Sequence, residues 1–308
     1  MLTAGTIING GLRLVRERPV SVAIWGLVYL GATIVGGLLL VLPLLRMRME
    51  PMQGGQFVPP DPMAMMGSIY LFDFGILVLL VVLVAAGLRA VLRPEDGGFA
   101  FIRLGMDEVR LVGLALLFFI AMIAIAVVFG ILLAIFIGAG VAMAPGAPDA
   151  SAAPFGQIPA SAVVLMLLFY AGIVWLQVRL APSIALTMIR ERIAIGEAWR
   201  LTRGHFWPMF GGFLVLGLML MLGYLALLLL VVAPFFGEIA RGFGPGGMAA
   251  LQQGNVGGLG AFGIAMIVGT IGFAILAGIG IAFWAGGIAT ATAALLEEEG
   301  EGIAAAFE

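Results

Sequence analysis

Residues 111–144 read LVGLALLFFIAMIAIAVVFGILLAIFIGAGVAMA, without a charged side chain and without alternation of apolar and polar residues. About 20 helical residues cross a hydrocarbon core of about 30 Å. In lipid, only helices and closed barrels satisfy every backbone polar group, and barrel strands alternate in polarity. The stretch therefore predicts a transmembrane helix. Because it is longer than a span needs, we expect it to tilt, to break or to extend into water.

Five further apolar runs of spanning length accompany it, at residues 20–45, 69–92, 161–189, 207–236 and 261–296. The composition agrees, since 63% of the residues are hydrophobic, 10% are charged and the mean hydropathy is +1.19. Such a chain has too little polar surface to cover a globule in water. We predict an all-α, polytopic membrane helical bundle of six transmembrane helices, forming one integral membrane domain over residues 1–308. The first run is interpreted as a retained anchor and not as a signal peptide.

The positive charges are distributed unevenly along the chain. All 15 basic residues are Arg, and 12 of them lie in or beside the N-terminal tail and two alternate connectors. The other three, Arg46, Arg48 and Arg241, lie in the connectors between. This partition is the positive-inside pattern, and it predicts that both termini face the cytoplasm. The absence of Lys beside abundant Arg, Ala and Gly indicates a GC-rich bacterial genome, hence a bacterial inner membrane.

A weaker repeat underlies the six runs. Arg-Leu pairs precede the first, third and fifth runs at residues 13–14, 103–104 and 200–201, with spacings of 90 and 97 residues. The pattern predicts three parallel hairpin repeats, each led by a cytoplasmic interfacial helix, over roughly residues 1–95, 96–192 and 193–308. Residues 302–307 resemble the start of a fourth interfacial stretch.

Local signals fix some of the predicted helix ends. Gly204 is expected to end the third interfacial helix, and Pro208 to lie in the first turn of the fifth span. Pro19 is expected to do the same at the first span.

The third repeat also resembles a known family. Residues 179–182 (RLAP) and 190–211 (RERIAIGEAWRLTRGHFWPMFG) are similar to the signature of bacterial glycerophosphoryl diester phosphodiesterase membrane-domain proteins. The resemblance implies a multi-span membrane domain. Some relatives carry a soluble phosphodiesterase domain that needs several His and acidic residues around a metal. This chain has one His, so the resemblance implies the membrane domain without the enzyme.

Signals for chemistry are sparse, and we predict no catalytic residue, no cofactor and no metal. The chain has no Cys, which excludes disulfides and thiolate sites. His205 is expected to be a structural residue at the membrane boundary. The GLGAFG string at residues 258–263 matches a dinucleotide fingerprint, but it opens an apolar span and follows no strand. We interpret it as chance in a Gly-rich chain.

A methionine-rich segment at residues 47–66 leaves two interpretations open. Six Met residues lie there together with Glu50 and Asp61. Clustered thioethers bind Cu(I), a soft ion. The Gly and Pro residues between them also fit a plain connecting loop.

Two features bear on packing. Ala274, Gly278, Ala282 and Gly286 recur every four residues along the sixth run, which predicts a small-residue seam against another helix. Homo-oligomer contact is the alternative. Arg89 and Arg179, near the inner ends of the second and fourth spans, either snorkel to the headgroups or face a cytoplasmic cavity.

These patterns predict a non-enzymatic membrane protein that interacts with anionic lipid, as a scaffold or accessory subunit with a membrane or cytoplasmic protein partner. A transporter or channel for an apolar or lipid-like substrate is the alternative, because the spans hold few polar groups at mid-depth. No nucleic-acid partner is expected. The residues expected to face anionic lipid or a partner are Arg13, Arg16, Arg103, Arg110, Arg190, Arg192, Arg200 and Arg203.

Overall fold

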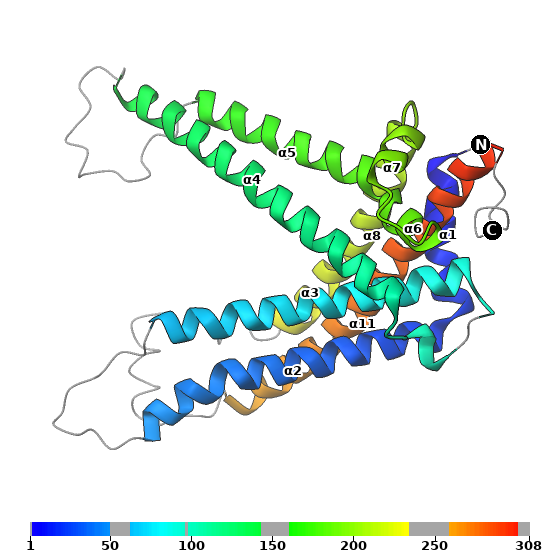
Figure 1. The fold of residues 1–308 in the computed structure, drawn as a ribbon. Helices are drawn as coiled ribbons and strands as arrows, with labels where there is room; N and C mark the ends of the chain where they lie inside the picture. Colours follow the sequence, from blue (N-terminus) through cyan, green and yellow to red (C-terminus); the bar gives the residue numbers. More distant parts are fainter. Residues whose placement is uncertain (1, 50–61, 96–97, 143–159, 234–258, 301–308) are drawn as a thin grey trace. The chain divides into compact units, whose positions relative to one another are not determined.

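The computed structural model describes residues 2–49, 62–95, 98–142, 160–233 and 259–300. Within these ranges the chain is helical and contains no strand, which confirms the predicted all-α class (Figure 1). Six of the described helical segments are long and apolar enough to cross a membrane, as expected for a multi-pass membrane protein. The helices belong to two compact units, which are described in turn.

The first unit comprises residues 3–104 and 211–291. Its α1 helix (Ala4–Glu17) is capped by Thr3, whose Oγ1 accepts a hydrogen bond from the Thr6 N–H at 3.2 Å. Pro19 opens the next helix, as predicted, because a first-turn Pro lacks only an N–H that has no partner there. The other elements of this unit are α2 (Pro19–Met49), α3 (Pro62–Leu92), η2 (Phe99–Phe101) and most of α8 (Phe206–Val232) and α11 (Leu259–Glu298).

Small residues of α11 bring its backbone against α1 and α2. Ala274, Gly278, Ala282 and Gly286 are all buried. A Cβ at Gly278 would lie 2.5 Å from the Val22 carbonyl oxygen of α2, and one at Gly286 would lie 2.6 Å from the Gly10 carbonyl oxygen of α1. Any larger side chain at these two glycines would therefore collide with main-chain atoms. The small-residue stripe therefore packs against α1 and α2, two helices of the same chain.

The connector after α3 departs from the prediction. The second interfacial helix is predicted around the 103–104 pair, but within residues 98–104 the structure has the 3-10 turn η2 alone, and Arg103 and Leu104 follow it outside any helix. Ala100 and Phe101 have positive φ angles of 51° and 60°, a conformation that breaks a right-handed helix. The prediction of an interfacial helix in the second repeat is therefore wrong.

Two side chains hold this turn from neighbouring helices. The Trp25 Nε1 donates to the Ala100 carbonyl oxygen at 2.9 Å, and the Arg89 Nη1 donates to the Phe101 carbonyl oxygen at 2.7 Å. Arg89 is only 3% exposed, so the expectation that it snorkels to the headgroups is wrong. The Arg18 guanidinium lies 5.5 Å from the centre of the Phe101 ring, within cation–π range.

The second unit comprises residues 1–2, 105–210 and 292–308. It contains α4 (Met106–Ala142), α5 (Ala160–Leu180), α6 (Pro182–Ile189) and α7 (Ile195–Leu201). Helices α4 and α5 lie side by side (Figure 1). Helix α4 has 37 residues, about 55 Å at 1.5 Å per residue. It is uninterrupted, so the break considered for this long apolar run is absent within α4.

The fourth apolar run divides at Pro182, which starts α6. Proline has no N–H to continue the hydrogen-bond ladder of α5. The adjacent Ser183 hydroxyl donates to the Leu180 carbonyl oxygen at 2.6 Å. Helix α6 contacts α4, α5 and α7, and seven of its eight residues are buried. It is the centre of this unit.

The predicted end of the third interfacial helix is displaced by two residues. Helix α7 ends at Leu201 and its C-cap is Thr202, so Gly204 lies beyond the cap, where its φ of 84° suits a residue without a Cβ. Pro208 lies in the first turn of α8. The three-repeat arrangement itself stays a prediction, although α2 packs on α3 and α4 on α5. Residues 50–61 of the methionine-rich segment, and residues 302–307, lie outside the described residues.

Candidate functional site

The arginines expected to face lipid or a partner divide between the two units. Arg13, Arg16 and Arg103 belong to the first unit and are exposed. The Arg13 Nε lies 3.3 Å from the Glu17 Oε1, one helical turn away. The remaining residues of the predicted set belong to the second unit, where they are grouped around α6 and α7: Arg110, Arg190, Arg192, Arg200 and Arg203.

Three arginines of the second unit line one pocket of about 390 Å³. The pocket is formed by Arg190, Arg192, Gly196, Glu197 and Arg200. Its volume lies within the range of about 300–1,000 Å³ that is typical of small-molecule sites. All of its charged side chains come from the turn after α6 and from α7.

Glu197 orients the arginines at the pocket. Its Oε1 accepts from the Arg190 Nε at 3.0 Å and lies 2.9 Å from the Arg190 Nη2. Its Oε2 lies 3.7 Å from the Arg192 Nη2. The Glu197 side chain is 13% exposed and that of Arg190 is 23% exposed, so this fork-like pair is shielded from water. Such a pair fixes both side chains more firmly than a surface ion pair does.

The turn that carries the pocket is held from both of its flanks. On one side, the Ala194 N–H donates to the buried Thr187 Oγ1 of α6 at 3.4 Å. On the other side, the Arg110 Nη2 of α4 lies 3.4 Å from the Glu191 Oε2 and its Nη1 lies 3.2 Å from the Asp107 Oδ1. Arg110 is therefore a bridge between α4 and the turn.

Arg179 positions α7 from the end of α5. Its Nη2 donates to the Trp199 carbonyl oxygen at 3.3 Å, and its Nε donates to the Thr202 Oγ1 at 3.4 Å. Its guanidinium carbon also lies 4.4 Å from the Trp199 ring centre and 5.3 Å from that of Trp175. Arg179 thus joins the fourth span to the helix that supplies Gly196, Glu197 and Arg200.

Acidic residues at the end of α11 meet the rim of the site. The Arg200 Nη2 lies 3.2 Å from the Glu299 Oε2. The His205 Nε2 lies 3.0 Å from the Glu298 Oε2, and the Glu298 Oε1 accepts from the Leu2 N–H at 2.6 Å. His205 therefore has an acidic partner that sequence reasoning missed, because the two residues are far apart in the chain.

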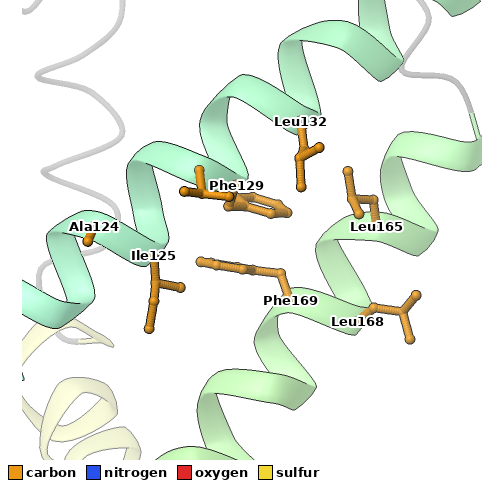
Figure 2. A pocket seen from close by; sticks show the side chains of 8 residues that line it. Ala124, Ile125, Phe129, Leu132, Leu165, Leu168 and Phe169 are labelled. Atoms are coloured by element: carbon orange, nitrogen blue, oxygen red, sulfur yellow. The ribbon is translucent and has the colours of Figure 1, made fainter.

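A second concavity lies between α4 and α5 and is entirely apolar. It has a volume of about 520 Å³. Figure 2 shows the Phe129 and Phe169 rings stacked on each other in its lining, and their centres are 3.7 Å apart at an interplanar angle of 13°. With no polar side chain in its lining, it offers dispersion contacts only. The lining residues are Ala124, Ile125, Val128, Phe129, Leu132, Leu165, Leu168 and Phe169.

Sequence reasoning identified the arginines of the polar pocket but missed two of its elements. Gly196 and Glu197 line the pocket beside Arg190 and Arg192. The available signal was the dense alternation of Arg and Glu between residues 190 and 200. The turn that folds α7 back toward α6, which brings Glu197 onto Arg190, carries no sequence pattern of its own.

No protein-family model matches the chain, and no curated protein or solved structure shows significant similarity to it. The resemblance to the glycerophosphoryl diester phosphodiesterase membrane domains therefore stays a prediction.

Proposed function

We propose that this protein is a non-enzymatic, multi-pass protein of a bacterial inner membrane, with both termini in the cytoplasm, that binds anionic lipid. It acts as a membrane scaffold or accessory subunit and engages a membrane or cytoplasmic protein partner. The observation that supports the proposal is the pocket of Arg190, Arg192 and Arg200 at the ends of apolar helices.

The exposure of the arginines supports lipid binding. The side chains of Arg13, Arg192 and Arg200 are 69%, 74% and 66% exposed. A basic residue near an anionic leaflet contributes about 1 kcal/mol of attraction, which decays within a Debye length of about 10 Å at 0.1 M salt. Several exposed arginines near the headgroups would therefore concentrate anionic lipid around the helices.

Aromatic residues beside this charge support a location at the headgroup level. Trp207, at the start of α8, is 75% exposed. Its ring lies 5.3 Å from the ring of Phe206 and 6.1 Å from that of Phe210. Trp and Tyr gather at membrane interfaces because their rings are apolar and their polar edges bind water. Arg203, on the short connector between α7 and α8, is also exposed.

Native mass spectrometry tests the proposal. The full chain is placed in nanodiscs of phosphatidylcholine and phosphatidylglycerol, and bound phosphatidylglycerol is counted for the wild type and for a variant with Arg103→Gln, Arg200→Gln and Arg203→Gln. We expect bound phosphatidylglycerol to fall several-fold in the variant. A matched control removes the same charge from the opposite connectors, with Arg46→Gln, Arg48→Gln and Arg241→Gln. Unchanged phosphatidylglycerol in the first variant, with topology intact, would contradict the proposal.

A transporter or channel for an apolar or lipid-like substrate is the second candidate function. The observation that favours it is the apolar groove between α4 and α5, around Phe129 and Phe169. A lipid-flipping assay in proteoliposomes separates the two functions. Wild-type flipping that Phe129→Ala reduces would favour transport, whereas lipid retention without flipping favours the scaffold.

A further inference from the structure

The polar pocket carries more positive charge than its own carboxylate neutralises. Three arginines and one glutamate line it. Glu197 is engaged with Arg190 through both nitrogen atoms of one guanidinium edge. Arg192 reaches Glu197 only at 3.7 Å and remains 74% exposed. The pocket therefore presents one fixed guanidinium and two that keep most of their donors available.

The Arg200 guanidinium of the pocket is held only weakly, by Glu299 at the rim. Arg200 pairs with Glu299 at 3.2 Å, but the two side chains are 66% and 39% exposed. An exposed pair of this kind contributes little to stability. An anion that entered the pocket would therefore displace Glu299 at little cost.

Space for such an anion is left by Gly196. It lines the pocket, and a Cβ built on it would meet no atom within 4 Å. Gly196 lies in the first turn of α7, between the turn that carries Arg192 and the helix position of Arg200. Because glycine has no side chain, Gly196 leaves open space in the lining between Arg192 and Arg200.

We infer that this pocket binds the dianion of a phosphate monoester, which deepens the proposed lipid function and rests on it. Guanidinium forks match phosphate oxygens in geometry and charge. The lining holds three arginines and one glutamate, and Glu299 reduces this excess of positive charge only through a weak, exposed pair with Arg200. The excess favours a dianion over a phosphodiester, which carries one negative charge. A monoester also offers three terminal oxygens to the guanidinium groups of the lining. The source is either a lipid headgroup of the phosphatidic acid type or a soluble phosphorylated molecule.

Lipid selectivity tests this inference. The full chain is placed in phosphatidylcholine nanodiscs that contain equal fractions of phosphatidic acid and phosphatidylglycerol, and bound lipids are identified by native mass spectrometry. We expect at least a tenfold preference for phosphatidic acid. Arg192→Gln and Gly196→Phe should remove the preference. Arg46→Gln, which changes an arginine outside the lining and outside the set proposed to face lipid, and Gly196→Ala, which adds only a Cβ in open space, should keep it.

A second arm separates the two sources of phosphate. Inorganic phosphate and glycerol 3-phosphate are titrated into protein held in pure phosphatidylcholine nanodiscs, with binding followed by calorimetry. Saturable, Arg192-dependent binding supports a soluble ligand, and its absence together with phosphatidic acid selectivity supports the lipid.

The outcomes that overturn the inference differ from those that overturn the proposed function. Equal retention of both lipids, sensitive to the Arg200→Gln and Arg203→Gln changes, would reject the monoester pocket and leave general anionic-lipid binding intact. A phosphatidic acid preference that survives both Arg192→Gln and Gly196→Phe would place the selectivity elsewhere and also reject the pocket. Retention of neither anionic lipid, with no soluble phosphate bound, would reject both.

Discussion

The Arg89 side chain of α3 donates a hydrogen bond to the Phe101 carbonyl oxygen at 2.7 Å. This bond joins the inner end of a predicted span to the turn that leads out of it. Arg89 is buried, so its guanidinium is not exposed at the headgroups and donates to a main-chain acceptor inside the protein. The neighbouring Ala100 carbonyl is bonded by Trp25, and the left-handed turn is fixed at both residues.

Replacing Arg89 should destabilise this end of the first unit. Arg89→Met keeps an unbranched side chain, although a shorter one, and leaves the buried Phe101 carbonyl oxygen without this donor, at a cost of about 1–3 kcal/mol. The free energy of unfolding in mixed micelles measures the change. Arg103→Gln, an exposed arginine on the same connector, is the control and should have little effect. Equal stability of both variants would show that the bond contributes nothing.

Bulky residues in the α11 seam should be poorly tolerated. Gly278→Leu and Gly286→Leu would place side chains on the carbonyl oxygens of Val22 and Gly10, and overpacking costs about 1–3 kcal/mol or more. We expect a clear drop in the melting temperature in detergent. Ile275→Leu is the matched control, because Ile275 is 57% exposed on the other face of the same helix. If the glycine variants melted with the control, the seam would not hold the helices together.

Loss of the Arg179 fork should loosen α7. Arg179→Lys keeps the charge but loses the guanidinium contact with the Trp199 ring and the forked donation to the Trp199 carbonyl and Thr202. Hydrogen exchange of residues 195–201 should become several-fold faster, while exchange in the middle of α5 stays unchanged. Arg203→Lys, at an exposed position, should alter neither. Unchanged exchange in α7 would mean that other contacts position the helix.

The orientation of the chain rests on the distribution of arginine alone. Reporter fusions after Asp149 and Arg241 should be active outside the cytoplasm, and fusions after Asp96 and Glu197 should be active inside. Alkaline phosphatase and a fluorescent protein provide complementary readouts. A fusion after Glu308 that reports the outside would contradict the six-span topology, because it requires an odd number of crossings.

Apolar runs of spanning length were sufficient to predict the six long helices and the all-α class, because in lipid only helices and closed barrels satisfy every backbone polar group. The first-turn positions of Pro19 and Pro208 and the positive φ of Gly204 just beyond α7 were also readable, since these residues restrict or permit particular backbone angles. The turn at Ala100 and Phe101 was not readable. Neither residue favours a positive φ, and the conformation depends on donors from two other helices.

The roles of Arg89 and Arg179 were hidden for a related reason. Both donate to main-chain carbonyls, at Phe101 and Trp199, and every residue has a carbonyl regardless of its type. Sequence patterns therefore identify the donors but not the acceptors. The polar pocket could be predicted only in part. Its arginines stood out in the sequence, but the fold of the turn that brings them together with Gly196 did not.

The backbone contact between α11 and the first two helices bears on how the protein is made. Gly10 and Val22 leave the ribosome before their partners Gly286 and Gly278, which lie more than 250 residues later in the chain. Contacts between residues so far apart in sequence form late and slowly. The surfaces of α1 and α2 that pack against α11 therefore lack this partner until α11 has been synthesised and inserted. During that interval, a membrane insertase or chaperone with a small-residue helix of its own can bind the same surfaces, so we expect biogenesis of this protein to depend on protection of α1 and α2.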